Sequence, residues 1–106
     1  PYNREKIEQL VESGDKVFVD FTAKWCLTCL ANEKVVLNSD GFAQLVKEKK
    51  IHLFKADWTM QNKNITEALA AFGRSSVPMY VYYGGKGNYV ILPQILTVDI
   101  IKEKMR

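Results

Sequence analysis

The sequence is poor in the residues from which metal centres and disulfide frameworks are built. Its 106 residues include two cysteines, one histidine and three prolines. A zinc site needs four ligands, and beyond the cysteines only His52 could add a ring nitrogen. Long apolar runs are also missing, since the longest, such as 79–83, have the length of a strand rather than the roughly 20 residues of a membrane-spanning helix. Neither a zinc site nor a membrane span is therefore expected in this stretch of sequence.

Charge of one sign is in short supply as well. Fifteen Lys and Arg residues face twelve Asp and Glu residues, which gives a net charge of +3. Such a small and evenly spread excess does not favour nucleic acid or a membrane surface as a partner. The apolar fraction of 47% and the charged fraction of 25% are ordinary for a globular protein. We expect a single domain over residues 1–106, monomeric by default, that needs no disulfide to fold. Because it begins at Pro1 without Met, we interpret it as a processed or excised piece.

Hydrophobic periodicity predicts an alternation of helices and strands. Strands are expected at 16–22, 51–57, 78–83 and 88–92, and helices at 3–13, 27–37, 65–72 and after Thr97, with a further helical turn or two around 42–46. The first strand is rich in β-branched and aromatic residues, which is typical of a sheet interior. Because helices separate most of the strands, we expect parallel pairs, followed by an antiparallel hairpin that turns at 84–87. The expected fold class is α/β: a mixed four-stranded sheet, with a short fifth strand as an option, flanked by helices on both faces.

The two cysteines stand where the first strand is expected to end and a helix to begin. Cys26 and Cys29 are three residues apart, a spacing that places both on one face of a helix. The N-terminus of a helix offers positive charge and free N–H groups, which lower the pKa of a Cys26 thiol. We therefore expect Cys26 to be exposed and to attack another disulfide, and Cys29 to resolve the mixed disulfide. A structural disulfide and a Cu(I)-carrying dithiol are the alternatives.

The segments around this pair resemble known proteins. Residues 17–29, which end in Trp-Cys-Leu-Thr-Cys, resemble the thioredoxin superfamily. Residues 26–33, 72–80 and 92–97 are similar to the C-terminal thioredoxin-like domain of thiol:disulfide interchange proteins of the DsbD type. The resemblance implies a thioredoxin fold and a protein-disulfide reductase that relays electrons with no cofactor beyond its own cysteines.

The same resemblance implies a cellular setting. It implies the periplasmic side of the bacterial inner membrane, as part of a membrane protein. The partners would be the transmembrane domain of the same parent protein and periplasmic redox proteins with reactive thiols or disulfides. A free-standing thioredoxin-like reductase is the alternative within the same class.

The resemblance also assigns roles around the dithiol. Pro78, which follows Val77, matches a cis-proline that faces the cysteines. The backbone of Val77 would then pair with a substrate segment as an added strand. The plainer interpretation is a proline at the start of a strand. Trp25 matches a tryptophan that shields the site, whereas Trp58 and the tyrosines are expected to be packing residues.

Two acidic residues are singled out in the same way. Asp20 matches a buried acid beneath the cysteines and would shuttle a proton for Cys29, unless it reaches solvent at the strand end. Glu33 matches a second acid near the dithiol, and the alternative is a solvated glutamate on a helix surface. Lys55 matches a lysine beside the buried acid. Leu30 departs from the pattern, because many relatives carry a lysine after the second cysteine and this chain lacks that charge.

Overall fold

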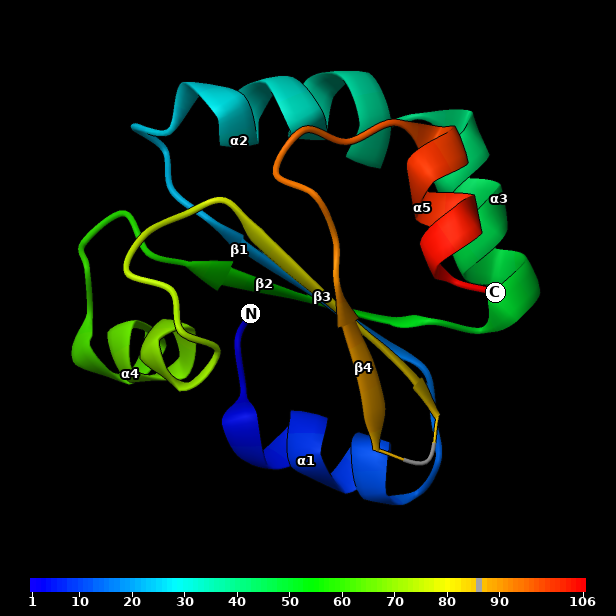
Figure 1. Ribbon diagram of the computed structural model, residues 1–106, viewed down its shortest axis with the longest axis horizontal. Coiled ribbons are helices and arrows are strands. Elements are labelled where there is room, and N and C mark those ends of the chain that lie inside the picture. Colours follow the sequence, from blue (N-terminus) through cyan, green and yellow to red (C-terminus); the bar gives the residue numbers. More distant parts are fainter. Residues whose placement is uncertain (86) are drawn as a thin grey trace.

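A four-stranded mixed sheet forms the centre of the molecule (Figure 1). The computed structural model describes residues 1–85 and 87–106, so that Lys86, in the predicted turn 84–87, lies outside the described residues. The strands stand in the spatial order β2-β1-β3-β4, and their bounds are β1 (Val17–Thr22), β2 (His52–Asp57), β3 (Met79–Gly85) and β4 (Asn88–Ile91). The predicted mixed four-stranded sheet is confirmed, and the optional fifth strand does not occur among the described residues.

The register of the sheet brings two distant segments to one edge. β1 pairs in parallel with β2 but antiparallel with β3. The expectation of parallel pairing is therefore wrong for β3. The reason for the antiparallel pairing is that the chain leaves β2 and enters β3 at the same end of the sheet. The helix between the two strands does not carry the chain back to the other end of the sheet. As a result Phe21, near the end of β1, pairs with Met79, at the start of β3.

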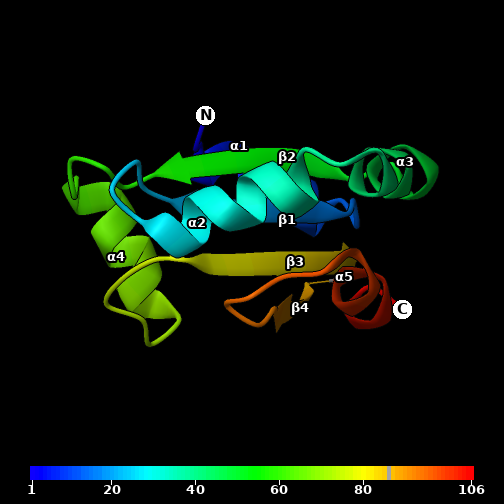
Figure 2. The same cartoon turned by 90° about the horizontal axis from the view of Figure 1, so that it is seen from above.

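Helices cover both faces of the sheet, as predicted (Figures 1 and 2). They are α1 (Arg4–Glu12), α2 (Leu27–Asn32), the π-helical turn η1 (Glu33–Leu37), α3 (Asp40–Lys49), α4 (Lys63–Ala71) and α5 (Val98–Lys104). α1 and α4 lie on one face, and the other helices lie on the opposite face, with α2 over β1 in Figure 2. Among the described helices, none combines the length and the apolar character needed to cross a membrane.

Alternate residues of β1 point to opposite faces of the sheet and pack into two separate hydrophobic cores. Val17, Val19 and Phe21 pack with Ile7 of α1 and Leu69 of α4 on one face. Burying an aliphatic or aromatic side chain of this kind contributes about 1.5–3 kcal/mol, so both helices are held by their apolar stripes.

The second core lies beneath the opposite helices. Phe18 packs there with Val36 of η1, Phe42 of α3 and Ile101 of α5. Since Asp20 is two residues from Phe18 in the same strand, its side chain points toward this face. β1 therefore carries both a core residue, Phe18, and an acid, Asp20, on the face that the α2–η1 segment covers.

The helix predicted over 27–37 is present, but it is not an α-helix throughout. The α-helix gives way at Glu33 to a π-helical turn, in which the N–H of Asn38 bonds to the C=O of Glu33 at 2.9 Å. Cys29, Asn32 and Val36 face the sheet. Three apolar residues of this segment are exposed: Leu27 82%, Leu30 42% and Val35 71%. Leu37, in contrast, packs against the core, so part of the apolar set of this segment faces the sheet and part faces solvent.

Candidate active site

The two cysteines form a disulfide at the start of α2. Cys26 is the N-cap of this helix and has an extended backbone. Its Sγ accepts a hydrogen bond of 3.2 Å from the backbone N–H of Cys29, and the two Cα atoms are 5.2 Å apart. The predicted pairing at the beginning of a helix is confirmed. In the reduced protein the same N–H group would stabilise a thiolate on Cys26, because it is one of the helix donors without a partner in the helix.

Cys26 is more covered than the sequence suggested. Its exposed fraction is 8%, against 1% for Cys29, so the expectation of a freely exposed attacking thiol is wrong in degree. The cause is local packing, since Cys26 is bonded to Cys29 and clustered with Ala23, and Val77 packs against the pair. Cys26 is still the sulfur nearer to solvent, and it lies next to the exposed side chains of Trp25 and Leu27.

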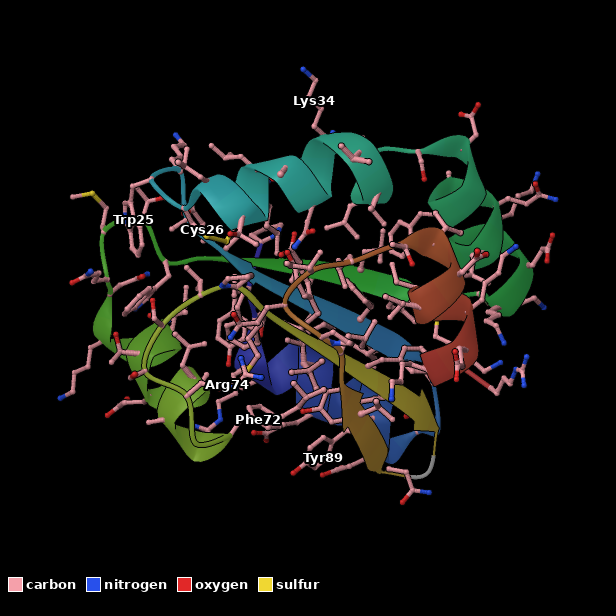
Figure 3. All side chains as sticks on the ribbon, turned by 45° about the horizontal axis from the view of Figure 1, so that its top comes forward. Trp25, Cys26, Lys34, Phe72, Arg74 and Tyr89 are labelled. Atoms are coloured by element: carbon pink, nitrogen blue, oxygen red, sulfur yellow. A yellow bond between two sulfur atoms is a disulfide. The ribbon has the colours of Figure 1, made fainter. Side chains whose placement is uncertain are left out.

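Trp25 lies on the outer side of the disulfide (Figure 3). Its Nε1–H donates to the carbonyl of Thr59 at 3.0 Å, and its ring centroid lies 5.7 Å from that of Trp58. The indole is 48% exposed. A hydrogen bond and a ring contact thus hold an apolar surface beside the dithiol, which fits the predicted shielding position. Trp58 is 6% exposed and is a packing residue, as expected.

The start of β3 forms the opposite wall of the site. The Val77–Pro78 peptide bond is cis, as the resemblance implies. Pro78 is buried and Val77 is half-buried, with the Val77 side chain against the cysteine pair. The antiparallel register of β3 explains this closeness, because β3 begins where β1 ends. The pairing of the Val77 backbone with a substrate stays a prediction.

Asp20 is a half-buried acid in a central strand of the sheet. Burial raises its pKa from the ordinary 3.8 to about 7, while the charge of Lys55 lowers the pKa and that of Glu33 raises it. Its Oδ1 is enclosed and has no hydrogen-bond partner among the described residues. The role of Asp20 as a proton shuttle stays a prediction. No hydrogen bond joins Asp20 to either cysteine within the part of the chain that the structure describes.

Glu33 and Lys55 form an ion pair above this acid. The Nζ of Lys55 lies 3.1 Å from Oε1 of Glu33, with side-chain exposures of 51% and 30%. Lys55 also lies opposite Asp20 in the register of β1 and β2, as the resemblance implies. Glu33 is therefore neither fully solvated nor bonded to the dithiol, and its partner is Lys55. A direct role of Glu33 at the cysteines stays a prediction.

A cavity of about 250 Å³ opens beside Asp20. Glu33 and Lys55 line it together with the carboxyl of Asp20. A space this large with several polar groups can hold water. Water there would connect Asp20 with solvent without crossing the side of the dithiol that faces Trp25.

The site offers no alternative set of metal ligands. Across residues 1–85 and 87–106, no group of three or more His, Cys, Asp or Glu side chains comes together in a way that could hold a metal ion. His52 is exposed at the start of β2, far along the sheet from the cysteines, which follow the end of the parallel strand β1.

Asn32 is a residue of the site that the sequence reasoning missed. It is 5% exposed, and its Nδ2 donates to Oη of Tyr80 at 2.8 Å and to the carbonyl of Gln94 at 2.7 Å. Its Oδ1 accepts from the N–H of Leu96 at 3.1 Å. The available signal was its position, since Asn32 comes three residues after Cys29 and so shares its helix face.

Fold and site together define the class: a thioredoxin-fold protein that carries a dithiol–disulfide pair at a helix N-terminus, the arrangement of a dithiol oxidoreductase. The chain belongs to the thioredoxin-like family, since residues 2–85 match the family described as "Thioredoxin-like". No curated protein gives a significant match to the sequence.

Several solved structures have the same fold. The chain is similar to the C-terminal domain of DsbD from Neisseria meningitidis in the reduced form (TM-score 0.73, 17% identity) and in the oxidised form (TM-score 0.75, 18% identity), with 96% of each chain covered in both comparisons. It is also similar to Trxlp from Edwardsiella tarda EIB202, with a TM-score of 0.73 and 22% identity over 100% of this chain and 97% of that chain. The resemblance read from the sequence is confirmed at the level of the fold.

Proposed function

We propose that the protein is a protein-disulfide reductase that acts by thiol–disulfide exchange. The observation that carries the proposal is the bonded pair of Cys26 and Cys29 at the N-terminus of α2, with Val77 packed against it. A purely structural disulfide would close too short a loop to constrain the unfolded chain much. No cofactor beyond the two cysteines is needed for this chemistry.

The exchange proceeds in two balanced steps. In the reduced protein the Cys26 thiolate attacks one sulfur of a partner disulfide, so that a Cys26–partner bond forms while the partner's own S–S bond breaks and its second sulfur leaves and takes up a proton. Cys29 then loses its proton and attacks Sγ of Cys26. The intramolecular disulfide forms, and the remaining partner sulfur leaves as a thiolate. Two electrons have passed from the dithiol to the partner.

Asp20 is proposed to accept the proton that Cys29 gives up. A pKa of about 7 means that the carboxyl can both take up and release a proton near neutral pH, which is what a general base requires. No hydrogen bond joins Asp20 to the cysteines among the described residues, and neither cysteine lines the cavity beside it, so we propose that a water molecule between Cys29 and Asp20 carries the proton.

The cellular role is proposed from the family resemblance. The protein would be the periplasmic C-terminal domain of a membrane thiol:disulfide interchange protein, reduced by the transmembrane domain of the same parent and reoxidised by periplasmic redox proteins, and monomeric as an isolated domain. The segments 26–33, 72–80 and 92–97 support this over a free-standing thioredoxin, whereas the similarity to DsbD C-terminal domains supports the fold.

Capture of partners tests the proposal. A Cys29→Ser variant should retain partners as mixed disulfides through Cys26 in periplasmic extract, whereas the matched Cys26→Ser variant should not.

An assay with NADPH and thioredoxin reductase separates a DsbD-type domain from a free-standing thioredoxin, because direct reduction of the purified protein would favour a free-standing thioredoxin. Mass spectrometry gives the third arm: a mass change of about 2 Da on reduction, without metal, fits the loss of one disulfide. Copper retained at stoichiometry would overturn the proposal in favour of a Cu(I) carrier.

A further inference from the structure

Thr59 joins the loop after β2 to the segment that leads into Cys26. Its Oγ1 accepts a hydrogen bond of 2.8 Å from the backbone N–H of Lys24, and its carbonyl accepts the indole N–H of Trp25 at 3.0 Å. β1 and β2 are parallel, so the loops that follow them leave the sheet at the same end (Figure 1). One threonine therefore holds both residues that directly precede Cys26.

Asp57 fixes the orientation of the Thr59 hydroxyl. A hydroxyl has one proton to donate and two lone pairs with which to accept. The Oγ1–H of Thr59 donates to Oδ1 of Asp57, which also accepts the backbone N–H of Thr59 at 3.0 Å. With its proton on the side of the carboxylate, the hydroxyl turns its lone pairs to the N–H of Lys24. The same hydrogen bonds lower the pKa of Asp57 from its ordinary 3.8, so the acceptor is a carboxylate at neutral pH.

The segment that Thr59 holds sets the geometry of the reactive sulfur. The segment closes in a turn, in which the N–H of Cys26 bonds to the C=O of Ala23 at 3.1 Å. Lys24 lies inside this turn, so its hydrogen bond to Thr59 anchors the turn to the neighbouring loop. Cys26 then begins α2 with Sγ at 3.2 Å from the N–H of Cys29. The placement of Sγ at the helix N-terminus therefore depends on a turn that one hydroxyl fixes.

We propose that Thr59 is a positioning residue of the dithiol, and that Asp57 orients its hydroxyl for this purpose. The proposal rests on the reductase function proposed above. Thr59 takes no part in the exchange of bonds and acts through the backbone of Lys24 and the indole of Trp25. Its effect is on the thiolate: while the turn is held, Sγ of Cys26 keeps its N–H donor at the helix start, and the charged form is stabilised.

The substitution Thr59→Val removes the hydroxyl and keeps the shape of the side chain and the carbonyl that holds Trp25. We expect the pKa of Cys26, read from the pH dependence of its alkylation by iodoacetamide, to rise by about one unit. One unit below the wild-type pKa, this rise leaves about tenfold less thiolate. The greater nucleophilicity of the more basic thiolate offsets part of that loss, so reduction of a disulfide-linked peptide dimer should slow about threefold. Thr59→Ser keeps the hydroxyl and should restore both values.

Asp57→Ala tests the orienting group separately. Removal of a nearby negative charge by itself lowers the pKa of a thiol, whereas loss of the fixed hydroxyl should raise the pKa of Cys26. A rise therefore identifies the orienting role, and a fall or no change overturns it. Asp57 is exposed, so this variant keeps the core intact and decides the question even where Thr59→Val does not fold.

Thr66→Val is the matched control, because Thr66 holds the other tryptophan of the chain. Its Oγ1 accepts the indole N–H of Trp58 at 2.7 Å, and its hydroxyl makes no hydrogen bond to residues 23–26 in the part of the chain that the structure describes. The variant should lower the free energy of unfolding but leave the pKa of Cys26 and the reduction rate within twofold of the wild type. All these variants keep the other charged side chains around the site, which are Asp20, Lys24, Glu33 and Lys55.

The outcomes distinguish this role from the reductase function. If the wild type does not reduce the peptide dimer, the proposed reductase function fails. If the wild type reduces it and Thr59→Val has the same pKa of Cys26 and the same rate, the function stands and the positioning role of Thr59 is wrong. A shift in Thr66→Val as large as that in Thr59→Val would also overturn the role, since it would reflect a general loss of packing.

Discussion

Replacing Asp20 with asparagine should stabilise the oxidised protein above neutral pH. Burial raises the pKa of Asp20 from 3.8 to about 7, and each unit of difference between the folded and unfolded states corresponds to about 1.36 kcal/mol. Once the carboxyl ionises in both states, the folded protein therefore carries a cost of about 4 kcal/mol. Below pH 4 the group is protonated in both states and the cost is absent. Stability should fall as the pH rises from 4 through 7 and then level off.

Urea unfolding of the oxidised protein measures this cost. The free energy of unfolding is compared at pH 5 and pH 9 for the wild type and Asp20→Asn, because asparagine has the size of aspartate and no charge. The wild type should lose about 2–3 kcal/mol more than the variant between the two pH values, because part of the cost is already present at pH 5. Parallel pH profiles would refute the reasoning, since they would mean that Asp20 ionises at its ordinary pKa despite its burial.

Three further predictions concern the neighbours of this acid and the core. Lys55→Met removes the cation that lowers the pKa of Asp20, so the midpoint of the stability loss should move to higher pH, with at most about 1 kcal/mol lost from the exposed ion pair. Tyr80→Phe leaves one N–H of Asn32 without its partner and should cost about 1–3 kcal/mol in the urea assay. Leu69→Ala in α4, 1% exposed, should cost about 2–5 kcal/mol and lower the melting temperature, and an unchanged value would mean that α4 is not packed as described.

The strand pattern of the fold could be predicted because it is local. The β-branched and aromatic residues of 16–22 predict an interior strand, and β1 occupies this part of the chain. Asn3 and Thr97 stand at the starts of two predicted helices, and both side chains accept a backbone N–H there. The direction of β3 could not be foreseen, because the length and position of α4 decide it rather than any residue of β3.

The face of the α2–η1 segment shows where sequence periodicity fails. Leu27, Leu30 and Val35 have the spacing of a buried stripe, yet they are exposed. Leu27 and Leu30 are exposed because Cys29 and Asn32 are the residues of α2 that face the sheet, and no residue in 33–37 signals the π-helical turn that follows. Asn32 was overlooked for a related reason, since asparagine on a helix is usually exposed.

Some residues of the site could be predicted from the local sequence, and others could not. The pairing of Cys26 with Cys29 followed from residue spacing alone, whereas Asp20 and Pro78 were identified only through the family resemblance. The exposure of Cys26 depends on packing by Ala23 and Val77, and nothing in the sequence indicates that these two residues cover it. Packing between the segment after β1 and the residue before β3 determines how much of Cys26 is exposed to solvent.

The pKa of the Cys26 thiol in the reduced protein tests the central claim most directly. It is obtained from the pH dependence of alkylation by iodoacetamide, with mass spectrometry of the peptides to assign the modified cysteine. The account predicts that Cys26 is alkylated first, with a pKa clearly below the roughly 8.5 of a free cysteine. Preferential alkylation of Cys29, or a pKa for Cys26 at or above that of free cysteine, would contradict it.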